Sequence, residues 1–256
     1  MIPLTTDDIH LWLTFYDEVS PRQLVAYRAL LSEEEKKQEL RFHFPRDRRR
    51  FLVTRALVRT MLSRYAHCTP QEWIFCVNKF GRPEIVHPTD YTYVSFNISH
   101  THALIVLAIT KRASLGVDVE NVCVSDVSME AAKQFLAPSE IAALAAISDK
   151  KRRDRFFEYW TLKESYIKAR GKGVSLPLDK FSFNLGQNSF VDLVIEPELG
   201  DDGSRWRFWQ FRPALEYLVA VCVERIGPAS PALVVNKLTP LVHEEKLRIQ
   251  FLRTSG

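Results

Sequence analysis

Two acidic residues, Asp118 and Glu120, stand two positions apart in the apolar segment 115–122 (LGVDVENV). Side chains alternate along a strand, so both carboxylates are expected on one face, with the valines on the other. Neighbouring carboxylates repel each other unless a positive charge separates them, and Mg²⁺ is a hard cation that prefers oxygen ligands. The pair therefore predicts a magnesium site, while the exposed face of an edge strand is the alternative interpretation.

A third carboxylate, Glu164, occurs in segment 156–170 (FFEYWTLKESYIKAR), which has the periodicity of a helix. At about 100° per residue, Glu164 falls within the apolar arc of that helix, and Lys168 follows one turn later. A carboxylate among large apolar side chains is costly without a partner. Glu164 would complete the magnesium site, with Lys168 beside it for a phosphate. The alternative is a surface glutamate–lysine pair four residues apart.

The segment 96–103 (FNISHTHA) places Ser99 next to His100 where a β-hairpin is expected to turn. A nucleophilic serine–histidine pair is one interpretation, but adjacent strand residues point to opposite faces and no G-x-S-x-G turn surrounds Ser99. A transition metal held by His100 and His102 would need further ligands at suitable spacing. Contact of Ser99 and His100 with a phosphate fits better, and a plain polar turn is the remaining alternative.

Two other segments could contact a nucleotide. The turn at 79–84 (KFGRPE) carries Gly81, Arg82 and Pro83, and it could lay backbone and an arginine against a ligand, although a plain hairpin turn has the same sequence. The run 46–50 (RDRRR) is the densest basic cluster, and it predicts either a phosphate contact or a solvated helix face. The interleaved aromatic residues expected of a nucleic-acid surface are missing there.

These residues must be positioned by a mixture of helices and strands. Ser32 and Glu35 have the spacing of a capping box, and Pro45 separates that helix from a second one over 46–66. Residues 93–110 are typical of a β-hairpin, and Gly171 and Gly173 are expected to end the helix that carries Glu164. Three further strand candidates precede a linker at 227–232. The order of elements predicts an α+β protein in two halves of similar size.

Composition excludes several classes of protein. The 256 residues are 46% hydrophobic and 26% charged, which is ordinary for a globular chain. The net charge of +4 suits phosphorylated or acidic partners but is low for a dedicated nucleic-acid binder. The four cysteines are scattered without a C-x-x-C pair, and the first residues lack the pattern of a signal peptide, so reduced thiols and a cytoplasmic location are expected. The longest aliphatic run, 103–109, is too short to span a membrane.

Several of these motifs occur together, in this order, in one family. The chain resembles the Sfp-type (surfactin-synthetase-activating type) 4′-phosphopantetheinyl transferases in KFGRPEI, FNISHT, LGVDVE, FFEYWTLKESYIKARGKG and SLPLDKFSF, which together span roughly 79–183. The combination of G-V-D-V-E with W-x-x-K-E-S-x-x-K is specific. The resemblance implies an α+β monomer of two similar halves related by a pseudo-twofold axis, with coenzyme A between them. The expected boundaries are an N-terminal half at 1–112, a C-terminal half at 113–226 and a tail at 227–256.

The resemblance also implies a reaction and assigns residues to it. Phosphopantetheine is transferred from coenzyme A to a serine of an acyl, peptidyl or aryl carrier protein, and adenosine 3′,5′-bisphosphate is released. Asp118, Glu120 and Glu164 would hold Mg²⁺, Glu164 would take or help to take the serine proton, and Lys168 would neutralise the transferring phosphate or protonate the leaving group. The residues expected to contact coenzyme A are Arg50, Gly81, Arg82, Pro83, Ser99 and His100.

The chain departs from many of these relatives near the coenzyme A 3′-phosphate. Glu35 and Gln38 stand where lysines are usual, Phe51 replaces a threonine, and Arg82 replaces a lysine. These differences affect the 3′-phosphate contacts rather than the reaction. The preferred carrier, the choice of Mg²⁺ over Mn²⁺ and the role of the tail remain open at this point.

Two other functions compete with this one. A different magnesium-dependent phosphotransferase would be expected to carry a G-x-x-x-x-G-K-[ST] loop, which is absent. A noncatalytic module that binds nucleic acid or carrier proteins through 46–50 would keep its binding after loss of Asp118 and Glu164, and that binding would weaken steeply with salt.

Overall fold

The computed structural model describes residues 1–256 except 6–7, 112, 124–127, 187–188, 228–230 and 256. The first half of the chain forms β1 (Asp8–Phe15), α1 (Pro21–Arg28), α2 (Glu33–Arg41), α3 (Pro45–Tyr65), β2 (Ile74–Val77), β3 (Pro83–His87), β4 (Val94–His100) and β5 (Leu104–Lys111). The second half forms β6 (Leu115–Asn121), α4 (Met129–Phe135), α5 (Pro138–Ala145), α6 (Asp149–Arg170), β7 (Phe181–Leu185), β8 (Val191–Ile195), β9 (Trp206–Phe211) and β10 (Tyr217–Glu224). Three strands follow: β11 (Ala232–Thr239), β12 (His243–Lys246) and β13 (Phe251–Thr254).

Local sequence signals set the ends of several helices as expected. The Ser32 hydroxyl accepts a hydrogen bond from the Glu35 amide, and the Glu35 carboxylate accepts one from the Ser32 amide, which confirms the capping box of α2. Pro45 occupies the first turn of α3, where its missing N–H costs nothing. Gly171 ends α6 in the left-handed region with φ of 61°, which a residue with a side chain rarely adopts.

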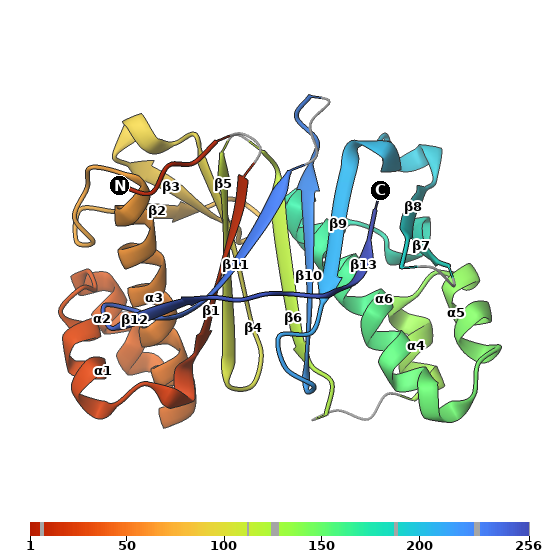
Figure 1. The fold of residues 1–256 in the computed structure, drawn as a ribbon, viewed down its shortest axis with the longest axis horizontal. Coiled ribbons are helices and arrows are strands. Elements are labelled where there is room, and N and C mark those ends of the chain that lie inside the picture. Colours follow the sequence, from red (N-terminus) through yellow and green to blue (C-terminus); the bar gives the residue numbers. More distant parts are fainter. Residues whose placement is uncertain (6–7, 112, 124–127, 187–188, 228–230, 256) are drawn as a thin grey trace.

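The two halves repeat one arrangement of elements. In the first, β1, the long helix α3 and the β2–β3 hairpin precede the antiparallel pair β4–β5, and the sheet order is β4-β5-β1. In the second, β6, α6 and the β7–β8 hairpin precede β9–β10, and the sheet order is β9-β10-β6. Figure 1 shows α1–α3 on one side of the strands and α4–α6 on the other. The fold is therefore α+β with two pseudo-symmetric halves.

Three hydrophobic clusters form the core, two within the halves and one between them. One fills the space between the first sheet and α3, and a second lies between the other sheet and α6. The third joins the two sheets and is built from aliphatic side chains of β1, β5, β6 and β10, of which Leu11 and Val221 are fully buried. Burial of both sheet faces explains why these strands are almost continuously apolar. Among the described residues, no helix combines the length and apolar character that crossing a membrane requires.

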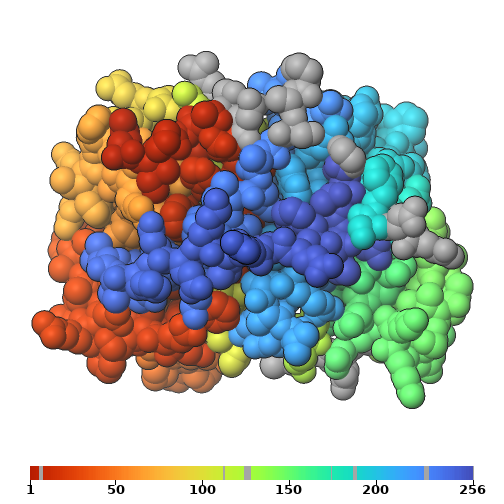
Figure 2. Space-filling view, in the orientation of Figure 1, coloured from red at the N-terminus to blue at the C-terminus, as the bar shows by residue number. Residues whose placement is uncertain are grey.

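The segment expected to form a separate tail contributes strands to both sheets. Strand β11 pairs in parallel with β1, β12 pairs with β11, and β13 pairs with β9 of the other half. Between them the chain crosses from one half to the other, where Leu247, Ile249 and Phe251 pack against the core between the sheets. Figure 2 shows this segment lying across the surface of both halves. The end of the chain therefore covers the junction on the face that this view shows.

Candidate active site

Helix α6 approaches strand β6 most closely at Gly116. A Cβ atom at this position would overlap the carbonyl oxygen of Ser165 and the amide nitrogen of Ala169, both of which are backbone atoms of the helix. Only glycine leaves room for this contact, which lies two residues before Asp118. The close packing of α6 on β6 brings the helix residues Glu164 and Lys168 to the strand carboxylates.

We expect Gly116→Ala to destabilise the protein by about 3 kcal/mol, because the added methyl group must push helix and strand apart. Transfer activity should fall with stability, since the same shift separates Lys168 from Asp118. Urea unfolding measures the first effect. Gly200→Ala is the control, because its Cβ meets nothing within 4 Å and its positive φ alone costs about 1–2 kcal/mol. Equal losses in the two variants would contradict the packing argument.

Asp118 lies at the centre of a buried polar cluster. Its Oδ1 atom is 2.6 Å from Nζ of Lys168 and accepts a hydrogen bond of 2.9 Å from the Ser99 hydroxyl. The side chain of Asp118 is 5% exposed and that of Lys168 26%, so water screens the ion pair only weakly. Residues from β4, β6 and α6 therefore meet at one point between the halves.

The other two predicted carboxylates lie near Asp118. Glu120 accepts a hydrogen bond of 3.0 Å from the indole of Trp160, and its pKa is raised to about 7, first by burial and then by the charge of Asp118. Burial and the same charge raise the pKa of Glu164, whereas Lys168 lowers it. Crowded carboxyl groups with raised pKa values favour a bound cation.

The chemistry of these donors fits a hard cation such as Mg²⁺. Asp118 Oδ2 is buried and has no hydrogen-bond partner, which is costly for an ionised carboxylate and leaves a ligand atom available. Within the described part of the chain, no three His, Cys, Asp or Glu side chains converge as a preformed metal site. The Lys168 ammonium supplies the positive charge beside Asp118 in this arrangement.

Ser99 and His100 do not act as one pair. Ser99 is buried and bonds Asp118, whereas the next residue, His100, is exposed. Partial burial of the His100 ring lowers its pKa, and the positive charge of Arg50 lowers it further. Arg50 itself pairs with Asp47 at 3.0 Å. His100 is therefore within electrostatic reach of Arg50 and also of Lys168 and Asp118, the two partners of Ser99.

The turn expected to contact a nucleotide is held by its own residues. The Asn78 side-chain oxygen accepts hydrogen bonds from the amides of Phe80 and Arg82, and Gly81 has a φ of 85°. Gly81, Arg82 and Pro83 line a cavity of about 260 Å³ together with Glu164 and Lys168. The turn therefore shares this cavity with Glu164 and Lys168, and its contact with a nucleotide stays a prediction.

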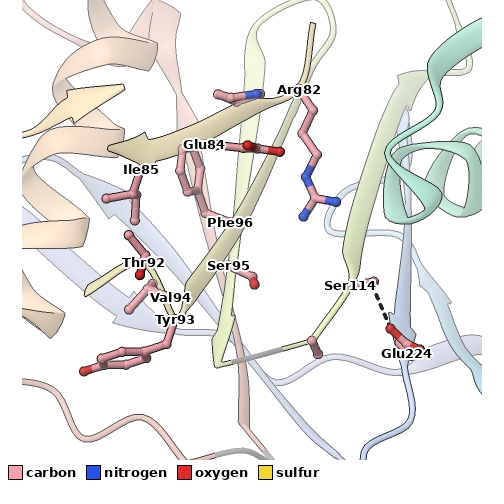
Figure 3. A pocket seen from close by; sticks show the side chains of 12 residues that line it. Arg82, Glu84, Ile85, Thr92, Tyr93, Val94, Ser95, Phe96, Ser114 and Glu224 are labelled. Atoms are coloured by element: carbon pink, nitrogen blue, oxygen red, sulfur yellow. Dashed lines mark hydrogen bonds between the residues drawn. The ribbon is translucent and has the colours of Figure 1, made fainter. Parts of the chain in front are cut away.

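A larger cavity of about 570 Å³ lies on the other side of Arg82 and Pro83. Figure 3 shows the Arg82 guanidinium pointing between Ser95 and Ser114, with Glu84 two residues further along on β3. Glu224 closes one end, where it accepts a hydrogen bond of 2.7 Å from Ser114. Arg82 thus stands between two cavities at the junction of the halves.

The basic run 46–50 is partly used inside the protein. Arg49 donates to the backbone carbonyls of Tyr16 and Asp17, and Arg48 donates to that of Phe42. These hydrogen bonds fix the start of α3 against the preceding segments of the chain. Arg48 and Arg49 are therefore less available to bind an external polyanion.

Glu35, which stands where many relatives have a lysine, stabilises the fold through ion pairs with two arginines. Glu35 is buried and forms ion pairs with Arg55 and with Arg59, the latter at 2.8 Å. It therefore cannot offer a contact to a phosphate, and the exposed Gln38 has no charge to offer.

Sequence reasoning missed three contributors to the site. Trp160 is one of them, because its indole N–H donates a hydrogen bond to Glu120. Gly116 was not singled out, although a glycine inside an apolar strand often marks a close backbone approach. Asn97 donates nothing to the cluster but accepts a hydrogen bond from the Val117 amide, which aligns β4 with β6.

Comparison with known proteins identifies the family. The family model described as "4′-phosphopantetheinyl transferase superfamily" matches residues 114–222, and "4′-phosphopantetheinyl transferase, N-terminal" matches residues 18–112. A solved structure of holo-[acyl-carrier-protein] synthase from Thermotoga maritima aligns with a TM-score of 0.36 and 22% identity, over 44% of this chain and 64% of that one.

Relatives of similar length agree with the family models. The 4′-phosphopantetheinyl transferase HetI of Nostoc sp. is 32% identical over 88% of this chain and 92% of its own. The 4′-phosphopantetheinyl transferase Sfp of Bacillus subtilis is 32% identical over 77% and 83%. The chain therefore belongs to the Sfp-type family of 4′-phosphopantetheinyl transferases, and it is an enzyme of that kind.

Proposed function

We propose that this enzyme transfers 4′-phosphopantetheine from coenzyme A to a serine hydroxyl of an acyl, peptidyl or aryl carrier protein, with Mg²⁺, and releases adenosine 3′,5′-bisphosphate. The observation that carries the proposal is the meeting of Asp118, Glu164 and Lys168 beside the cavity lined by Gly81 and Arg82. Phosphoryl transfer depends mainly on positioning and charge neutralisation, and this arrangement offers both.

The carboxylates would hold the metal. Asp118, through its unpartnered Oδ2, together with Glu120 and Glu164 would bind Mg²⁺. The ion would neutralise charge on the diphosphate of coenzyme A. Nζ of Lys168 has three N–H donors, of which Asp118 and Ser99 accept two, so the third can bind an oxygen of the transferring phosphate.

The transfer forms one oxygen–phosphorus bond and breaks another. The carrier serine oxygen forms a bond to the phosphorus that bears the pantetheine, and the bond from that phosphorus to the bridging diphosphate oxygen breaks. The serine proton moves to Glu164, whose raised pKa makes it a better acceptor than an exposed glutamate. The bisphosphate leaves with the bridging oxygen, to which the Lys168 ammonium can donate a proton.

The remaining residues would bind the adenosine end of coenzyme A. His100 at the end of β4 and Arg50 on α3 present hydrogen-bonding or positive groups, and Arg82 presents its guanidinium at the cavity between the halves. Gly81 and Pro83 would lie against the adenine. Both halves of one chain supply the site, which supports a monomer, and we propose that it acts in the cytoplasm without nucleic acid or membrane as partner.

Intact-mass spectrometry tests the proposal. An apo-carrier protein incubated with the enzyme, coenzyme A and Mg²⁺ should gain the mass of one phosphopantetheine. The same carrier with its acceptor serine changed to alanine should gain nothing. Removal of the metal with EDTA should stop the reaction, and added Mg²⁺ should restore it. Unmodified carrier in the complete mixture, across acyl and peptidyl carriers, would refute the activity.

We expect His100→Ala to raise the KM for coenzyme A by about 10-fold, because a hydrogen bond to a charged phosphate is lost in ground and transition states alike. The turnover number should fall less than about threefold on the same reasoning. Steady-state kinetics with varied coenzyme A measures both constants, and His102→Ala serves as the neighbouring histidine control. An unchanged KM with a collapsed kcat would instead give His100 a chemical role.

A further inference from the structure

Side chains, rather than backbone pairing, connect strand β4 of the first half to strand β6 of the second. The amides of Val117, Val119 and Asn121 donate hydrogen bonds to side-chain oxygens of Asn97 (2.9 Å), Ser99 (3.3 Å) and Thr101 (3.1 Å), respectively. Asn97 and Ser99 belong to β4 and Thr101 follows its last residue, so the three acceptors are spaced two residues apart and face β6. We call this set of three hydrogen bonds the seam; it fixes the register between the two halves.

The central residue of the seam has a second set of partners. The Ser99 hydroxyl donates to Oδ1 of Asp118 at 2.9 Å and accepts from Nζ of Lys168 at 2.9 Å, in addition to the Val119 amide. A hydroxyl has one donor and two acceptor positions, and all of them are used here. The side chain of Ser99 is also buried, with 6% of its residue surface exposed. It therefore has no hydrogen left to donate to a phosphate.

We propose that Ser99 is a positioning residue, which sets the place of the Lys168 ammonium relative to Asp118 and joins that pair to the seam, rather than a phosphate ligand. The kinetic consequence of this proposal rests on the proposed function, whereas the hydrogen bonds of Ser99 do not depend on it. Thr101 occupies the next place in the seam and bonds only the Asn121 amide among these groups. Thr101 is thus a natural control: it shares the seam but not the contact with Asp118 and Lys168.

Kinetics separate the two roles of Ser99. We expect Ser99→Ala to lower kcat by about 10–100-fold, as is typical when a group that orients active-site residues is removed. The KM for coenzyme A should stay within about threefold of the wild type, because no phosphate contact is lost. Thr101→Val should keep kcat within about threefold. A rise in the coenzyme A KM with unchanged kcat would make Ser99 a phosphate ligand and overturn the proposal, as would equal kcat losses in Ser99→Ala and Thr101→Val.

A second readout requires neither metal nor activity. In metal-free protein with ¹⁵N-labelled lysine, the Lys168 ammonium signal is assigned through its loss in Lys168→Arg. Ser99→Ala should shift this signal and increase the mobility of the ammonium, while Thr101→Val leaves it unchanged. Should Ser99→Ala prove unstable, Ser99→Cys, which is nearly isosteric but a much weaker hydrogen-bonding group, should show the same change. An unaltered ammonium signal in the folded variant would contradict the proposal. Wild-type protein that shows an ordered ammonium but no transfer would refute the proposed function alone.

Discussion

Replacing Asp118 by asparagine is expected to lower kcat by roughly 10³-fold. The substitution keeps the size of the side chain but removes the charge that Lys168 and the metal require. One Asp118 oxygen already serves Ser99 and Lys168, and the other is buried without a partner. Glu120 does not take over these contacts, because the Ser99 hydroxyl and the Lys168 ammonium both bond Asp118, whereas Glu120 accepts from the Trp160 indole.

The measurement is single-turnover transfer to an apo-carrier at saturating Mg²⁺ and coenzyme A, together with circular dichroism to verify folding. Asp192→Asn is the matched control, because Asp192 is exposed on β8 and far from the cluster in the fold. It should keep full activity. If Asp118→Asn retains activity within a few-fold of the wild type, the assignment of the metal site is wrong.

Local patterns in the sequence were sufficient to predict several parts of the site. Alternation along β6 predicted Asp118 and Glu120 on one face of the strand, helical spacing put Lys168 one turn after Glu164, and Gly171 marked the end of α6. Each of these features depends on residues close together in the chain. The capping box that starts α2 was predictable for the same reason.

Features that depend on long-range contacts could not be predicted in this way. The sequence of residues 227–256 does not indicate that β11 pairs with β1. Parallel strands that are distant in the chain are not joined by a short turn, so no local sequence signal marks their pairing. The hydrogen-bonding partners of Ser99 come from β6 and α6, so the sequence indicated a polar residue but not its role. Likewise, the need for glycine at position 116 appears only when α6 lies on β6.

Glu164→Gln is expected to lower kcat by about 10²–10⁴-fold, the range typical of losing a general base. Glutamine has nearly the same shape but cannot accept the serine proton. Glu164 is the one predicted carboxylate that comes from the helix, and it lines the cavity with Arg82 and Lys168. Burial and the charge of Asp118 raise the pKa of Glu164, which strengthens it as a proton acceptor once it is ionised.

Coenzyme A should still bind to this variant, because its proposed phosphate contacts, His100 and Arg50, belong to the other half of the chain. Isothermal titration of coenzyme A and single-turnover transfer at saturating Mg²⁺ give the affinity and kcat separately. Glu245→Gln, an exposed glutamate on β12, controls for the general effect of removing an acidic group.

A titration with Mg²⁺ distinguishes the two roles that Glu164 can have. A residue that only binds the metal would lose affinity for it, and excess Mg²⁺ would then restore transfer. If Glu164 also accepts the proton, its replacement leaves a defect that no concentration of Mg²⁺ repairs. Filling the metal site does not restore the lost proton acceptor. We expect the second result, since the serine must lose its proton as its oxygen bonds to phosphorus. Near-normal turnover in Glu164→Gln would remove Glu164 from the mechanism, and full recovery at high Mg²⁺ would leave it as a ligand alone.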